Sequence, residues 1–139
     1  MSEDAFWESN LILRVLCGSR AYGLDTPESD TDSRGVCIPP PRLLLGLSSF
    51  EQHESPGCDH VVYSLQKFAR LALAGNPNII ETLFTDRSDV LFIDAFGERL
   101  VAARERMLSR RVGERFMGYA LAQRKRIEGH HRWLETPPE

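Results

Sequence analysis

The stretch that decides the fold runs from Leu11 to Cys37 and reads LILRVLCGSRAYGLDTPESDTDSRGVC. The apolar run of residues 11–17 is typical of a mostly buried β-strand, and Gly18 ends it. A tight turn at this point would expose backbone N–H groups and the Ser19 hydroxyl, which suit phosphate oxygens. A glycine-serine pair after a strand is more often an ordinary turn, so the pair alone does not establish a phosphate site.

Asp30 and Asp32 form a D-x-D pattern that follows the glycine-serine pair after ten intervening residues. On a strand, residues two apart project from the same face, so both carboxylates would lie together. A divalent cation relieves their repulsion, and hard oxygen ligands suit Mg²⁺ or Mn²⁺ better than zinc. The alternative is a solvated acidic turn, because residues 25–30 are rich in turn formers. For an isolated pair of acids, the turn is favoured.

Asp59 is the best candidate for the third acid of a two-metal phosphoryl-transfer site. It opens a strand predicted over residues 58–63, where an acid is costly to bury without a cation or a hydrogen-bond donor. The local alternative is an exposed position at the strand edge after Gly57. The three acids in combination with the glycine-serine turn favour a metal site.

Helical periodicity dominates the second half of the chain. The pattern predicts a helix over residues 64–74 that ends before Gly75. A short helix is expected to begin at Pro77, with Asn76 as its N-cap. Residues 90–93 fit either a short strand or the start of a longer helix.

A long helix closes the predicted fold, with Ser109 as a good N-cap for residues from about Arg110 to Leu134. One face of this helix carries the predicted core stripe: Val112, Phe116, Tyr119, Ala120, Ile127 and Leu134. A neighbouring face is basic and carries Arg111, Arg115, Lys125, Arg126 and Arg132. Because predicted strands (11–17, 31–38 and 58–63) precede the helices, we expect an α/β (α+β) fold with a small mixed β-sheet backed by helices.

Charge is distributed unevenly over the 139 residues, whose formal net charge is −3. Residues 99–132 hold ten Lys or Arg and three acids, while the remainder holds seven basic and seventeen acidic residues. The basic C-terminal third either faces phosphates or forms a solvated helix surface, and both interpretations stay open. The length is near the ~150 residues typical of one domain, so we expect a single domain over residues 1–139.

The three cysteines are odd in number and lack C-x-x-C spacing, which predicts a reducing compartment. Residues 1–10 show no basic segment before an apolar run, so no secretory signal is predicted. No apolar run approaches the ~20 residues that span a bilayer. We therefore expect a cytoplasmic protein without a membrane partner.

The segments GSRAYGLDTPESDTDSRGV (18–36) and SLQKFARLALAGNPNIIETLF (64–84) carry a family resemblance. They are similar to a bacterial and phage family of predicted nucleotidyltransferases within the DNA polymerase beta superfamily. More distantly, they resemble the minimal nucleotidyltransferases of toxin-antitoxin modules. The resemblance covers roughly residues 11–84 and implies a nucleotidyltransferase-like fold, with this segment as catalytic core and a helical part at about 94–135.

The resemblance also implies a reaction: transfer of a nucleoside monophosphate from a nucleoside triphosphate to a hydroxyl of RNA, a protein or a small molecule, with release of pyrophosphate. The cofactor would be Mg²⁺ or Mn²⁺. The implied metal-binding and catalytic residues are Asp30, Asp32 and Asp59, with Asp59 helping to deprotonate the acceptor hydroxyl. The implied nucleotide-binding residues are Gly18, Ser19 and Arg20.

The alternative is a non-catalytic or regulatory interaction module of the same fold, such as one half of a toxin-antitoxin-like pair. Members of the resembled family are usually longer, so the chain is either a short member or a fragment. The acceptor, the base and the oligomeric state stay open, and a homo-oligomer and a helical partner protein are both compatible with the sequence. A Walker-type kinase is excluded because the chain contains no GxxxxGK[ST] motif.

Overall fold

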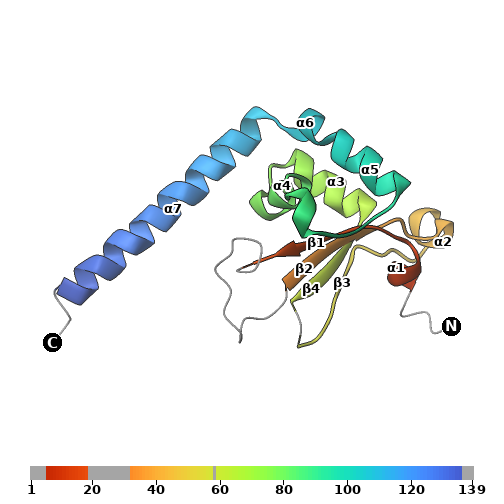
Figure 1. Cartoon of the computed structure of the whole chain (residues 1–139), viewed down its shortest axis with the longest axis horizontal. Helices are drawn as coiled ribbons and strands as arrows, with labels where there is room; N and C mark the ends of the chain where they lie inside the picture. Colours follow the sequence, from red (N-terminus) through yellow and green to blue (C-terminus); the bar gives the residue numbers. More distant parts are fainter. Residues whose placement is uncertain (1–5, 19–31, 58, 136–139) are drawn as a thin grey trace.

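The computed structural model describes residues 6–18, 32–57 and 59–135, with side chains described up to Gly129 (Figure 1). Five strands form one sheet in the order β3-β4-β2-β1-β5. Their bounds are β1 Leu11–Cys17, β2 Asp32–Cys37, β3 Gln52–Glu54, β4 His60–Ser64 and β5 Val90–Ile93. The helices are α1 Phe6–Ser9, α2 Pro41–Leu45, α3 Leu65–Leu73, α4 Pro77–Leu83, the 3₁₀ turn η2 Arg87–Asp89, α5 Ala95–Ala102, α6 Arg104–Met107 and α7 Arg110–Glu135.

The sheet is mixed, as predicted. Strand β2 runs parallel to β4, whereas β1 pairs antiparallel with both β2 and β5. Helices α3 and α4 cover one face of this sheet, and α5 lies over the same side (Figure 1). The α+β class and the small helix-backed sheet are therefore confirmed.

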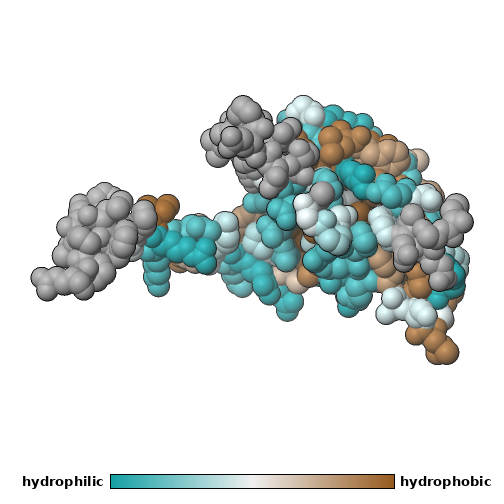
Figure 2. Space-filling model, turned by 90° about the horizontal axis from the view of Figure 1, so that it is seen from below, coloured by the Kyte–Doolittle hydropathy of each residue, from teal (hydrophilic) through white to brown (hydrophobic). Residues whose placement is uncertain are grey.

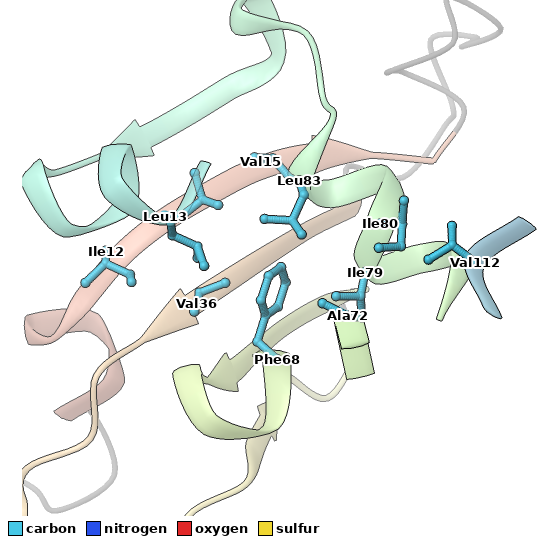
Figure 3. Packing of buried hydrophobic residues seen from close by; sticks show 11 residues of the cluster. Ile12, Leu13, Val15, Val36, Phe68, Ala72, Ile79, Ile80, Leu83 and Val112 are labelled. Atoms are coloured by element: carbon cyan, nitrogen blue, oxygen red, sulfur yellow. The ribbon is translucent and has the colours of Figure 1, made fainter. Parts of the chain in front are cut away.

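The main core lies between the sheet and these helices. Phe68 of α3 is fully buried and lies near Leu83 of α4 and Val36 of β2 (Figure 3). Val112 from the start of α7 packs against the same cluster, next to α4. A smaller cluster on the opposite face contains Leu11, Cys37 and Val62. Because β-strand side chains alternate, residues of β1 and β2 that face the helices are separated from those of the second cluster.

Side-chain caps begin the two central helices, α3 and α4. The Ser64 side chain accepts a hydrogen bond from the backbone N–H of Lys67 at the start of α3. Asn76 does the same for Ile79 at the start of α4, and Pro77 occupies the first turn. These observations confirm the predicted starts of both helices.

The structure shifts some of the predicted boundaries and decides between the alternatives left open for residues 90–93. The strand expected over 58–63 begins at His60 and ends at Ser64, so Asp59 directly precedes it. Residues 90–93 form strand β5, because they pair with β1 along its open edge. The helical segment that follows is split into α5 and α6 before α7 begins. Within the segment 31–38, residues 32–37 form β2, and residue 31 lies outside the described residues.

The long helix is confirmed as α7, but its predicted core stripe is wrong beyond the first turns. Val112 is buried and Phe116 is half-buried, whereas Tyr119, Ala120 and Ile127 are exposed. The reason is that α7 leaves the body of the protein after its first turns, so none of the other elements that the structure describes covers its later turns (Figure 1). The side chain of Leu134, the last predicted member, lies outside the described residues.

The exposed part of α7 is a largely hydrophilic projection (Figure 2). Its basic side chains Arg111, Arg115, Lys125 and Arg126 are all exposed, and the side chain of Arg132 lies outside the described residues. In the part of the chain that the structure describes, no helix is both long enough and apolar enough to cross a membrane.

Candidate active site

Two of the acids predicted from the sequence lie side by side at one end of the sheet. Asp32 begins β2, and the backbone N–H of the next residue, Ser33, donates a 3.0 Å hydrogen bond to the carbonyl of Asp59. The parallel register continues from there, with Ser33 opposite His60. By strand alternation, the side chains of Asp32 and Asp59 both project toward the helix-covered face.

Strand β1 brings a third residue into the same row. Cys17, its last residue, pairs directly with Asp32 across the antiparallel ladder. One row across the end of the sheet thus contains Cys17 at the end of β1, Asp32 at the start of β2 and Asp59 just before β4. This arrangement depends on the central position of β2 in the sheet.

Two features of the backbone at Gly18 favour glycine at this edge. Its φ of +77° lies in the left-handed region that favours glycine. A Cβ atom at this position would also lie 2.2 Å from Oδ2 of Asp32, far inside van der Waals contact. The backbone of Gly18 therefore lies directly against the carboxylate of Asp32.

The Asp32 carboxylate has an unsatisfied oxygen. Its Oδ1 atom is buried and has no hydrogen-bond partner among the described residues. A buried carboxylate oxygen without a donor is costly, and a bound cation removes that cost. The donor chemistry of Asp32 and Asp59, two hard oxygen ligands side by side, fits Mg²⁺ or Mn²⁺.

The described residues contain only part of the predicted metal site. Among them, no group of three or more His, Cys, Asp or Glu side chains is close enough together to hold a metal ion. Asp30, Ser19 and Arg20, which the sequence assigned to metal and phosphate binding, lie outside the described residues. Of the six predicted site residues, the structure therefore describes three: Gly18, Asp32 and Asp59.

Charged side chains surround the end of β1. Burial raises the pKa of the Cys17 thiol above its ordinary value, and the Arg34 guanidinium opposes this shift. The carboxylates of Asp32, Asp59 and Glu81 raise the pKa further, so the thiol stays protonated. Cys17 is thus a neutral, half-buried neighbour of the carboxylates, as expected for a small packing residue rather than a nucleophile.

Arg34 is a site residue that the sequence analysis did not identify. It lies two positions after Asp32 on β2 and therefore shares its face of the sheet, which is the signal that could have identified it. Its Nη1 donates a 3.1 Å hydrogen bond to the carbonyl of Asn78 in α4. This bond ties the helix that carries Glu81 to the strand that carries Asp32.

The opposite face of the sheet supports the same two strands. The Ser33 hydroxyl and Nδ1 of His60 are 2.7 Å apart and form a hydrogen bond between β2 and β4. Since Ser33 follows Asp32 and His60 follows Asp59, this bond holds the backbones of both acids in register. It is a positioning contact beneath the site.

The comparisons with known proteins give the family. The profile of the RNA repair pathway DNA polymerase beta family matches residues 3–135. An uncharacterized 38.9 kDa protein in the nrdC-mobD intergenic region of Enterobacteria phage T4 is 33% identical over 86 residues, which cover 53% of this chain and 25% of the phage protein. The uncharacterized protein MJ0002 of Methanocaldococcus jannaschii is 28% identical over 124 residues, covering 84% of this chain and 50% of that protein.

This chain therefore spans half or less of the length of these two relatives. No solved structure gives a significant match. The profile match, in contrast, extends over nearly all of the chain and includes the strands and helices around Asp32 and Asp59. On this basis, the chain belongs to the RNA repair pathway DNA polymerase beta family, a family of DNA polymerase beta-like nucleotidyltransferases.

Proposed function

We propose that this chain is a metal-dependent nucleotidyltransferase that moves a nucleoside monophosphate from a nucleoside triphosphate to a hydroxyl acceptor. The observation that carries the proposal is the Asp32 carboxylate, whose buried Oδ1 lacks a partner among the described residues, beside Asp59 and against Gly18. An arrangement of this kind is unfavourable unless a cation binds there. The family membership supports the same reaction class.

The proposed roles follow from position and charge. Asp32 and Asp59, together with Asp30 from the sequence motif, hold Mg²⁺ or Mn²⁺. When bound, the metal neutralises the phosphate charge and lowers the pKa of the acceptor hydroxyl. Gly18, with Ser19 and Arg20 of the motif, holds the β and γ phosphates through backbone N–H groups, the hydroxyl and the guanidinium.

The proposed transfer balances without a covalent intermediate. The acceptor oxygen forms a bond to the α phosphorus, and the bond from that phosphorus to the bridging oxygen of pyrophosphate breaks. Asp59 accepts the proton of the acceptor hydroxyl, and pyrophosphate leaves with the electron pair of the broken bond. The protein contributes orientation and charge stabilisation.

RNA is the acceptor that we favour. The name of the family refers to RNA repair, and the exposed face of α7 carries Arg111, Arg115, Lys125 and Arg126. Figure 1 shows α7 extending from the body on the side of the sheet at which β1 ends. A basic surface on that side would attract a polyanionic acceptor toward the site.

The test begins with ligand binding, which requires no acceptor. Thermal unfolding is measured with each nucleoside triphosphate, with and without Mg²⁺, for wild type and for Asp30→Asn/Asp32→Asn and Asp59→Asn. A triphosphate at ~100 times its Kd should stabilise the wild type by ~2.7 kcal/mol. The exposed α6 residue Glu105, changed to Gln, serves as a control for the loss of one negative charge.

Transfer is then followed with α-labelled triphosphate and RNA that carries free or blocked terminal hydroxyls. We expect metal-dependent labelling of the free RNA by wild type and Glu105→Gln, and none by the Asp variants. If folded wild type shows no metal-dependent binding of any triphosphate, the proposed function is wrong, and the non-catalytic interaction module becomes the better interpretation.

A further inference from the structure

A cavity of about 280 Å³ opens beside Gly18. Its walls come from the end of β1, from Arg34 of β2, from the last turn of α4 and from the residues that lead into η2. The volume is near the lower limit of small-molecule sites, which suits one compact ligand group. Because Gly18 and Cys17 form part of this wall, the cavity adjoins the Asp32 carboxylate.

The polar wall of the cavity consists mainly of hydrogen-bond acceptors. The hydroxyls of Thr82 and Thr85 donate their protons to the carbonyls of Asn78 and Glu81, at 2.8 and 2.9 Å. Their oxygens can therefore only accept further bonds. The half-buried Glu81 carboxylate forms no hydrogen bond or ion pair with any residue that the structure describes.

Charge limits what can enter this cavity. The acidic residues Glu81, Asp86 and Asp89 line it, and Arg34 is the only basic residue among the described residues that do so. One N–H of Arg34 is already used by the carbonyl of Asn78. Such a wall repels phosphate groups and attracts a neutral group that brings its own hydrogen-bond donors.

An aromatic surface completes the cavity. Phe84 lies in its wall and is 41% exposed. The guanidinium of Arg104 lies over this ring, 4.9 Å from its centroid, and Arg104 lines a separate cavity that also includes Phe84. Phe84 thus lines both cavities, and its exposed ring supplies apolar surface there.

We propose that the cavity receives the nucleoside of the triphosphate and that Glu81 accepts hydrogen bonds from the ribose hydroxyls. This inference rests on the proposed function, which places the phosphates at Gly18. The acidic wall repels the triphosphate group, so the uncharged nucleoside is the part of the ligand that enters the cavity. Two neighbouring ribose hydroxyls supply the donors that a single carboxylate can accept, and the base meets Phe84. Glu81 would then select ribonucleotides over deoxyribonucleotides.

The test compares the Kd values of ribonucleoside triphosphates with those of their 2′-deoxy and 3′-deoxy counterparts, in Mg²⁺ and without acceptor. The variants are Glu81→Ala and Glu81→Gln, with Glu105→Gln as the matched control. The fold should tolerate both substitutions, because the bond from Thr85 to residue 81 uses the backbone carbonyl and Ala and Gln are good helix formers. Thermal midpoints without ligand verify this for each variant.

We expect wild type and Glu105→Gln to bind the ribonucleotides about tenfold or more tightly than the deoxy forms, as for hydrogen bonds to a charged group. Glu81→Ala should abolish this preference by weakening ribonucleotide binding alone, and Glu81→Gln should retain part of it. If triphosphates bind but wild type shows no preference, or if Glu81→Ala weakens both classes equally, the inference is wrong while the proposed function stands. If wild type binds no triphosphate, both are wrong.

Discussion

Replacing Gly18 by alanine tests the link between the strand end and the Asp32 carboxylate. The chain provides a matched control, because Gly57 has nearly the same backbone, with φ of +76° against +77° at Gly18. A Cβ atom at Gly57 would meet no atom of the described residues within 4 Å, whereas at Gly18 it would lie 2.2 Å from Oδ2 of Asp32. The two substitutions therefore share the backbone strain and differ in the clash.

The magnitudes follow from these geometries. A non-glycine residue in the left-handed region costs roughly 1–2 kcal/mol, so both variants should lose about that much free energy of unfolding. The clash adds little to the loss at Gly18, because the Asp32 carboxylate can rotate away from the new methyl group. That rotation displaces a proposed metal ligand, so only Gly18→Ala should lose the metal-dependent stabilisation by triphosphate, ~2.7 kcal/mol at ~100 times the Kd.

Urea unfolding measures the first quantity, and thermal unfolding with triphosphate and Mg²⁺ measures the second. We expect Gly57→Ala to show the full ligand-induced shift of Tm and Gly18→Ala to show little or none. The reasoning is refuted if Gly18→Ala retains the shift of Gly57→Ala, because the carboxylate would then not need its present position. A loss of the shift in both variants would equally refute it.

Three other measurements test the core, a titrating thiol and the basic helix. Phe68→Ala should lower the free energy of unfolding by about 3–5 kcal/mol, since this ring is fully buried, and a loss below about 1 kcal/mol would contradict its packing. Burial raises the pKa of the Cys37 thiol from 9.0 to about 12, so its stabilising neutral form is complete below pH 9 and is lost as the pH rises toward 12. The free energy of unfolding measured in urea should therefore fall more steeply over this alkaline range for wild type than for Cys37→Ala. Parallel pH profiles of the two proteins would argue against this explanation. For the proposed transfer to RNA, KM should rise with salt, and Lys125→Gln/Arg126→Gln should flatten that dependence; an unchanged salt slope would remove α7 from RNA binding.

The parts of the fold that the sequence predicted correctly depend on short-range interactions. Strand β1 ends at Cys17 because Gly18, the next residue, has a left-handed backbone that does not continue a strand. Helix α4 begins after Asn76 because a side chain three residues away satisfies a free backbone N–H. These signals lie within a few residues of the boundary that they determine.

For α7, local sequence patterns predicted the helix but not the burial of its apolar face. Periodicity correctly indicated a helix, but it could not tell whether another element covers Tyr119 or Ile127. Burial of a helix face depends on the path of the rest of the chain, and α7 leaves the body after its first turns, which carry Val112 and Phe116 (Figure 1). The apolar residues of α7 therefore recur at helical spacing, but Tyr119 and Ile127 are not part of a buried core.

The sequence by itself determined the chemistry available to this protein: a glycine at a strand end, a D-x-D pattern, a further acid and a basic helix. Tertiary structure decided which of these groups meet. The parallel pairing of β2 with β4 places Asp59 beside Asp32, and the contact of β2 with α4 brings Arg34 and Glu81 to the same edge. Pairing between strands separated by a long segment depends on the packing of the whole sheet and its helices, so no local pattern of residues specifies it.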